Sequence, residues 1–338
     1  MTSGSLPGSS SIGKRRFMAS ALNRLIIWSS ALLLISVIGF AAYYYVDRSD
    51  SRDSGFAQRE LAAAEQAVRD DPTNITNRIV LADLYFGKQR YEEAVEQYQA
   101  AVEINENSPL ARVGLGRAQW AVKDYAGASE NFNAVIKLST EEDISGSLVQ
   151  TAYYYLGKTA LEQGAPEEAA EHFSQATALE RTDADAWFML GTAYAEASML
   201  EEAADALGTA VSFVPNFKEA YELLVGIYEE QGLEGEVLYA RGMVAYAEGD
   251  LDAAAGKLED AIGASPALAQ AHTGLGLVRE IQGRDADAIV AYQQALHLNA
   301  NDFLARGGMA RLTGQTSEDD LPANHPDMGV SDGEGGTP

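Results

Sequence analysis

The stretch Asp183–Pro215, DADAWFMLGTAYAEASMLEEAADALGTAVSFVP, decides the fold. In its first half, apolar and small residues stand three and four positions apart, which is the spacing of one face of an α-helix. The pair Glu201 and Glu202 then opens a second apolar run. Because acidic side chains are favourable in the first turn of a helix, this stretch predicts two consecutive helices.

The same pattern recurs along the chain. Alanines equivalent to the one after this acidic pair are spaced 34, 41, 34, 51 and 34 residues apart, and a small residue stands twelve positions before each of them. A fixed period of this length predicts a repeat architecture, in which stacked units bury a face that no unit buries alone. The two series are Ala94, Ala128, Ala169, Ala203, Ala254 and Ala288, and Ala82, Gly116, Gly157, Gly191, Gly242 and Gly276.

The chain resembles the tetratricopeptide repeat family, whose units are helix-turn-helix pairs of this length. Six full units cover roughly residues 75–302. The resemblance implies an all-α, right-handed superhelical solenoid, to which the N-terminal sequence adds one transmembrane helix. In the opening stretch the matching residues are Trp187, Leu190, Gly191, Tyr194, Ala203, Leu207, Ala210 and Pro215.

Two irregular spacings divide the repeats. The spacing of 41 residues inserts a polar, acidic loop at Thr140–Gly146, and the spacing of 51 adds half a unit at 217–231. We expect this half unit to be a solitary capping helix, because a solenoid needs a helix over its last apolar face. A continuous superhelix with a local change in helix alternation is the alternative.

The expected order of domains follows from these spacings and from composition. It comprises a flexible basic N-terminus at 1–24, a transmembrane helix at 25–46, a linker with an N-terminal capping helix at 47–74, four repeats at 75–216, the solitary helix at 217–231, two repeats at 235–302, a C-terminal capping helix at 303–313 and a disordered acidic tail at 314–338.

The segment Leu25–Val46 carries no charge and is long enough to cross a membrane as a helix. Basic residues lie on its N-terminal side, so we expect a cytoplasmic N-terminus and a body outside the cytoplasmic membrane of a bacterium-like cell. The alternative is an export signal that is cleaved after the small residues Gly39-Phe40-Ala41. Both interpretations place the body outside the cytoplasm.

Charge and composition exclude several classes of function. A net charge of −26 repels nucleic-acid phosphates, so we expect no nucleic-acid binding. The charge either keeps the surface solvated or attracts a basic partner. The chain has no cysteine, which excludes disulfides, thiolate metal sites and cysteine nucleophiles.

No pattern predicts catalysis. The four histidines, His172, His272, His297 and His325, share no spacing that gathers metal ligands, so neither a metal nor another cofactor is expected. Serines lack a nucleophile elbow, and the paired glycines at 114–116 and 274–276 belong to repeat helices. The sequence therefore predicts a protein that is not an enzyme.

The resemblance implies a concave groove lined by the first helix of each unit. Aromatic residues and arginine are the usual anchors of protein interfaces. The alternative is that these side chains pack against neighbouring units. The expected partner-binding residues are Asp83, Phe86, Arg117, Trp120, Tyr154, Lys158, Phe188, Thr192, Tyr239 and Tyr246, with Val113, Leu161, Glu222, Glu229 and Met243 on the same faces.

We therefore expect a scaffold that binds exported or membrane proteins, or peptides from them, during secretion, envelope assembly or maturation of a membrane complex. No Lys and Asn pair recurs in the groove, so a clamp for a chaperone's C-terminal carboxylate is not expected. A glycan- or small-ligand-binding module is the alternative, since aromatic rings also stack on sugars. Self-association through the groove or the anchor is a third possibility.

Overall fold

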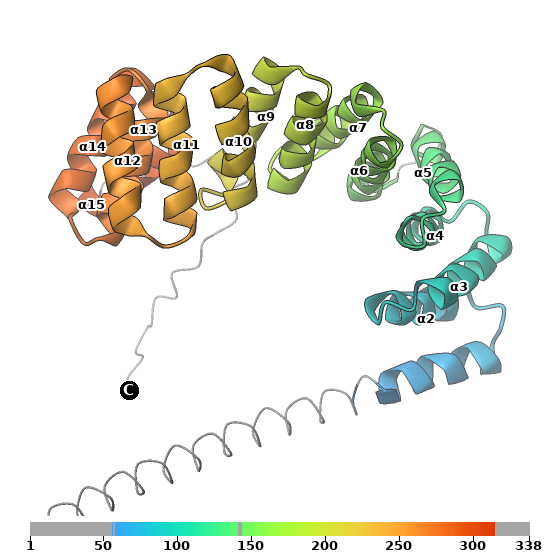
Figure 1. The fold of residues 1–338 in the computed structure, drawn as a ribbon. Helices are drawn as coiled ribbons and strands as arrows, with labels where there is room; N and C mark the ends of the chain where they lie inside the picture. The colour runs from blue at the N-terminus through green and yellow to red at the C-terminus, as the bar shows by residue number, and fades with distance from the viewer. Residues whose placement is uncertain (1–55, 57, 141–143, 315–338) are drawn as a thin grey trace, which may run out of the picture. The chain divides into compact units, whose positions relative to one another are not determined.

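The computed structural model describes residues 56, 58–140 and 144–314, which form parts of two compact units, residues 1–84 and 85–338. The described residues hold helices and no strand, so the expected all-α class is confirmed for them. A helical segment at 58–70 precedes α2 (Ile75–Gly87), α3 (Tyr91–Ile104), α4 (Pro109–Ala121), α5 (Tyr125–Ser139), α6 (Gly146–Glu162), α7 (Pro166–Leu179), α8 (Ala184–Glu196), α9 (Leu200–Phe213), α10 (Lys218–Gln231), α11 (Glu234–Ala247), α12 (Leu251–Ala264), α13 (Ala269–Ile281), α14 (Asp285–Leu298) and α15 (Phe303–Thr313) (Figure 1).

The N-terminal predictions at 1–24 and 25–46 lie outside the described residues, as do most of the acidic tail and part of the acidic loop. Among the helices that the structure describes, none is long and apolar enough to span a membrane. The expected domain boundaries stay predictions.

In the first unit, hydrogen bonds join the start of α2 to the helical segment at 58–70 and to the turn that follows it. The side-chain amide of Asn77 donates to the carbonyl of Ala67 at 3.2 Å, and Arg78 Nε donates to the carbonyl of Pro72 at 2.8 Å. Ala64, near the middle of the segment, is buried. This contact fixes the turn that leads into α2.

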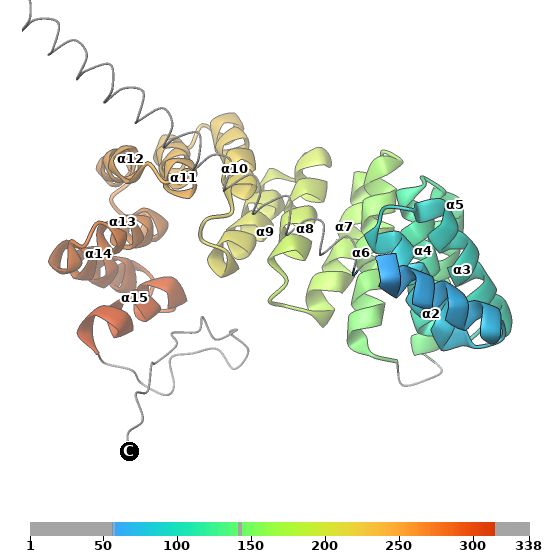
Figure 2. The ribbon, with the colours of Figure 1, turned by 90° about the horizontal axis from the view of Figure 1, so that it is seen from below.

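In the second unit, helices pack in consecutive antiparallel pairs, α4 with α5, α6 with α7, α8 with α9, α11 with α12 and α13 with α14 (Figures 1 and 2). The first helices of successive pairs also contact each other, as α4 does α6 and α6 does α8. No comparable contact joins α5 to α7 in the described part of the chain. The stack is therefore tighter on the side of the first helices, which makes that side the inner face.

Glycines bring the two helices of a pair together. A Cβ atom at Gly116 would lie 2.8 Å from the ring of Phe132, and one at Gly157 would lie 2.8 Å from the ring of Phe173. Both rings are fully buried. Any side chain at these two positions would displace an aromatic ring, so the close packing of the paired helices requires glycine there.

Left-handed residues end the first helices. Gly164, Gly249 and Gly283 have φ angles of 72°, 82° and 71°, the left-handed conformation in which helices commonly end. In other units Lys123 and Ser198 take the equivalent conformation with φ of 65° and 60°. A Cβ atom makes this conformation unfavourable, so these units carry local backbone strain.

Helix α10 lies between α9 and α11 and has no paired second helix of its own (Figure 2). It begins after Phe217 and ends at Gly232, whose φ is 73°. One buried cluster nevertheless extends from Ala203 on α9, through Tyr221 and Leu224 on α10, to Val278 on α13. The hydrophobic core is therefore continuous across the odd helix.

Candidate partner-binding site

A cation–aromatic cluster lies on the first helices α4 and α6. Helical spacing places Arg117 with Trp120 on one face of α4, and Tyr154 with Lys158 on one face of α6. All four side chains are half-buried. The cluster consists of Phe86, Arg117, Trp120, Tyr154, Tyr155 and Lys158.

The guanidinium of Arg117 lies between two rings. Its Cζ atom is 4.9 Å from the centre of the Phe86 ring and 6.0 Å from that of Tyr155. Contacts of this kind hold a cation by attraction to the negative face of the ring. They also fix the orientation of a long side chain that would otherwise be mobile.

The ammonium group of Lys158 faces three rings. Its Nζ atom lies 3.9 Å from the centre of the Trp120 ring, 5.2 Å from Tyr155 and 5.8 Å from Tyr154. Burial lowers the pKa of Lys158, against an opposing effect of the nearby Glu162 charge. The environment therefore disfavours the positive charge compared with water, and the rings offset only part of that cost.

Neither cation has a carboxylate partner within ion-pair distance among the described residues. Arg117 Nε and Trp120 Nε1 are moreover buried without a hydrogen-bond acceptor. An unsatisfied buried donor costs on the order of 1–3 kcal/mol, so such groups are uncommon and need an explanation.

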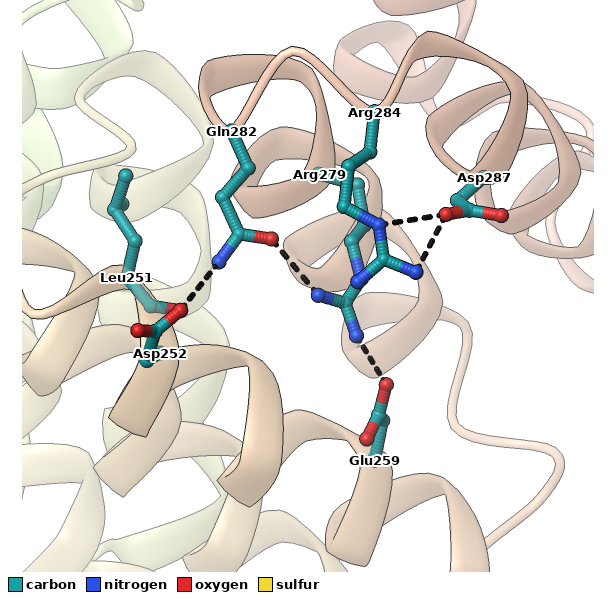
Figure 3. Close-up of polar contacts among 7 residues, drawn as sticks. All are labelled: Leu251, Asp252, Glu259, Arg279, Gln282, Arg284 and Asp287. Carbon is teal, nitrogen blue, oxygen red and sulfur yellow. Dashed lines mark hydrogen bonds and ion pairs between the residues drawn. The ribbon is translucent and has the colours of Figure 1, made fainter.

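Arg279, on α13, shows how a buried cation is satisfied elsewhere in this chain (Figure 3). It is 9% exposed, forms an ion pair with Glu259 and donates to Gln282 Oε1 at 2.8 Å. Its neighbour Arg284 pairs with Asp287 at 2.6 Å. Arg117 and Lys158, in contrast to Arg279, have no carboxylate partner in the described part of the chain.

Tyr155 joins the cluster but was not among the expected residues. Its ring stacks on Phe132 at 5.4 Å and meets Trp120 at 5.8 Å and Tyr154 at 5.7 Å, both edge-on. It therefore connects the buried core of α5 to the aromatic residues of the inner face. The run Tyr153-Tyr154-Tyr155 was the available signal, but periodicity does not show which of three adjacent rings faces inward.

The inner face continues onto α8 with less charge. Phe188 is half-buried and packs on Phe217 at 4.9 Å between ring centres. The hydroxyl of Thr192 donates to the carbonyl of Phe188 at 2.9 Å. Asp83 is exposed on α2, Leu161 is half-buried on α6, and Val113 is buried.

The expected residues on α11 lie in a different setting. Tyr239 and Met243 are buried, 7% and 1% exposed, whereas Tyr246 is half-buried. Glu222 and Glu229 are exposed and pair with Lys218 and Arg241. These side chains are therefore separate from the cation–aromatic cluster.

A cavity of about 440 Å³ lies between α9, α10, α11, α13 and α15. Its wall includes the rings of Tyr228, Tyr239 and Phe303 and the carboxylates of Asp205 and Asp302. Burial raises the pKa of Tyr228 to about 12, with a contribution from the charges of Glu236 and Asp205. The cavity is a second concave surface, with aromatic and polar walls.

The histidines do not gather. His172 lies beside Glu168 on α7, His272 is buried with its Nε2 3.1 Å from the carbonyl of Pro266, and His297 is exposed on α14. No group of three or more potential metal-ligating His, Asp or Glu side chains occurs within the described ranges. His325 lies outside them.

Profiles of the tetratricopeptide repeat match most of the stack. They cover residues 82–123, 113–178, 160–230 and 239–303, under the descriptions "TPR repeat" and "Tetratricopeptide repeat". The chain belongs to the tetratricopeptide repeat family. The repeats imply a scaffold for protein–protein interaction that binds proteins or peptides, and members of the family are typically non-catalytic.

Several solved structures are similar to the chain. YrrB, a TPR protein with an unusual peptide-binding site, is 21% identical, with 62% of this chain and 95% of that chain covered and a TM-score of 0.41. MamA from Desulfovibrio magneticus RS-1 is 21% identical over 53% of this chain and 97% of that chain, with a TM-score of 0.47. The Cut9–Hcn1 hetero-tetramer of APC/C is 17% identical over 77% and 46%, with a TM-score of 0.42. No curated protein matches the chain significantly.

Proposed function

We propose that this protein is a membrane-anchored scaffold whose repeats, outside the cytoplasm, bind a segment of a membrane or exported protein during assembly, secretion or maturation of an envelope complex. The observation that carries the binding role is the cation–aromatic cluster on α4 and α6. Its half-buried rings, and its two half-buried cations without a carboxylate partner among the described residues, are the features expected of a surface that binds a partner.

The geometry favours an extended segment rather than a flat interface. The cluster and Phe188 lie on first helices that contact each other in series, α4 with α6 and α6 with α8. A segment laid along these helices would meet Trp120, then Tyr154, then Phe188. Rigid aromatic side chains of this kind provide large contact area at low entropic cost.

Affinity purification from detergent-solubilised membranes tests the binding role. The full chain should retain a partner at stoichiometric yield, and Trp120→Ala should lose it while the chain stays helical by circular dichroism. Val290→Ala, a truncation of a side chain that is 65% exposed on α14, is the matched control. If Trp120→Ala retains the partner at the same yield, the cation–aromatic cluster is not the binding surface.

The proposed location has its own test. Because the chain has no cysteine, one introduced at the exposed Ala300 would be the only site for a membrane-impermeant maleimide. Labelling of intact cells is expected if the body is outside the cytoplasm. Labelling that occurs only after lysis would refute that location.

The cavity between α9 and α15 favours a second candidate function, the binding of a small polar ligand or glycan. Its volume of about 440 Å³ lies within the usual range of small-molecule sites. Its tyrosine rings and side-chain amides provide stacking and hydrogen bonding together. Screening glycans against the full chain and a Tyr228→Ala variant tests this candidate. Equal affinity of the two proteins for a glycan would exclude the cavity as its binding site.

A further inference from the structure

We infer that the cation–aromatic cluster recognises an acidic segment of the partner, with Arg117 and Lys158 as the two groups that receive its carboxylates. This inference rests on the proposed function, since it concerns the same surface. It specifies the chemistry of the partner that binds there.

Arg117 and Lys158 lack a carboxylate partner among the described residues, although both side chains are only half-buried. Guanidinium and ammonium groups are hydrogen-bond donors and accept nothing. A ligand that completes the cluster must therefore supply acceptors.

The two cations lie close to the same ring, that of Tyr155. Arg117 Cζ is 6.0 Å and Lys158 Nζ is 5.2 Å from its centre. Charge-assisted hydrogen bonds to a carboxylate are roughly twice as strong as neutral ones, and a guanidinium presents a fork that matches a carboxylate. Carboxylates therefore satisfy this site better than neutral acceptors.

Acidic residues outnumber basic residues in the chain, 50 to 24. Arg279, Arg284 and Arg311 each pair with a carboxylate. Two half-buried cations left without one on the inner face are complementary to an external anion.

The net charge of −26 opposes such a ligand at long range. At physiological ionic strength, however, the screening length is roughly 8 Å, which is comparable to the dimensions of the cluster. Salt therefore screens the repulsion between an acidic ligand and distant carboxylates of the protein. It weakens direct contacts of the ligand with Arg117 and Lys158 much less. The body's charge favours basic ligands and the cluster favours acidic ones, so the two effects make opposite predictions.

Selection from a random-sequence peptide library on the immobilised full chain tests this inference. We expect the retained peptides to be enriched in Asp and Glu. The double variant Arg117→Met, Lys158→Met should lose that enrichment, and its affinity for the selected acidic peptides should fall by about tenfold or more. Methionine keeps most of the length of both side chains, so loss of packing is minimised.

The matched control removes the same two charges elsewhere, by Lys137→Met on α5 and Arg284→Met at the start of α14. Both side chains are exposed. This variant should select the same acidic peptides with unchanged affinity. Equal loss in the two double variants would mean that only net charge matters, and would overturn the inference.

A further variant separates this inference from the proposed function. If Trp120→Ala abolishes peptide capture but the peptides captured by the wild type show no acidic enrichment, the cluster binds partners and the proposed acidic specificity is wrong. Enrichment in Lys and Arg would overturn the inference in the same way. If neither Trp120→Ala nor the cluster's double variant changes what is captured, both proposals fail.

Discussion

The ammonium group of Lys158 lies 3.9 Å from the centre of the Trp120 ring, which belongs to the preceding unit of the stack. The contact joins α6 to α4, and no carboxylate of the described residues pairs with the ammonium. Burial lowers the pKa of Lys158, so the folded protein disfavours its charge. A half-buried ammonium group without a carboxylate partner is better explained by binding than by stability.

Lys158→Met should therefore leave the free energy of unfolding unchanged or raise it by up to about 1 kcal/mol. Methionine retains the contact with the Trp120 ring without the desolvated charge. Chemical denaturation followed by circular dichroism measures the effect, with Lys137→Met as the exposed control. A loss greater than that of the control would show that Lys158 mainly stabilises the stack.

Tyr155→Ala should lower the free energy of unfolding by about 3 kcal/mol, because it removes a ring that packs on Phe132, Trp120 and Tyr154. The environment of Trp120 should change with it, which tryptophan fluorescence reports. Tyr155→Phe, which keeps the ring, should be nearly neutral. Equal stability of the two variants would contradict the central place of this ring.

Gly157→Ala should lower the free energy of unfolding by about 1–3 kcal/mol, because the added methyl group overlaps the buried ring of Phe173. Gly208→Ala is the matched control. It lies inside α9, and a Cβ there would meet nothing within 4 Å. That change should stabilise by about 0.5–1 kcal/mol through helix propensity. Thermal melts of both variants show whether steric overlap or helix propensity determines the effect of replacing a glycine in this stack.

Ser198→Gly should raise the free energy of unfolding by about 1 kcal/mol, since its φ of 60° is unfavourable for a residue with a Cβ. Gly164→Ala, at the equivalent turn with φ of 72°, should lower it by a similar amount. Urea denaturation of the two variants measures both shifts. Changes of the same sign would show that the turns are not equivalent.

Glu280 predicts a dependence of stability on acid. Burial raises its pKa, but hydrogen bonds from Arg311 and Tyr292, at 2.8 and 2.7 Å, outweigh burial and leave the pKa below the ordinary value of 4.5. A lowered folded-state pKa stabilises the protein above pH 4.5, and that contribution is lost as the pH falls through the folded-state value. Stability measured from pH 7 to pH 3 should fall more in the wild type than in Glu280→Gln.

The pairing of helices was readable from the sequence because it depends on local pattern. The glycine series and the aromatic residues sixteen positions later, such as Gly116 with Phe132 and Gly157 with Phe173, are in contact in the structure. The ends of the first helices at Gly164 were readable as well, since glycine is the residue that adopts that turn without strain. Ser198 was not, because nothing in its identity marks a positive φ.

The details of the site depend on contacts between units, which periodicity does not determine. Tyr155 stands between a residue of the buried face and one of the inner face, so either assignment fits a helical pattern. Met243 was placed on the groove side, yet it is buried, and its sulfur lies against Gly274 of the next first helix, α13. The contact of Phe213 with Phe303, 6.3 Å between ring centres, reflects rotations accumulated over several units.

The continuous core across α10 has a consequence for the order in which the stack opens. Its large buried cluster unites α9 to α13, whereas the cluster beneath α4 and α6 is built on fewer residues, among them Phe132 and Val135. In a repeat protein, stability is roughly a sum over neighbouring units, so amide hydrogens should exchange more slowly within α9 to α13 than around α4 to α6. The helices that carry Arg117 and Lys158 then belong to the more easily opened part of the second unit. A partner bound there would slow exchange in that part first.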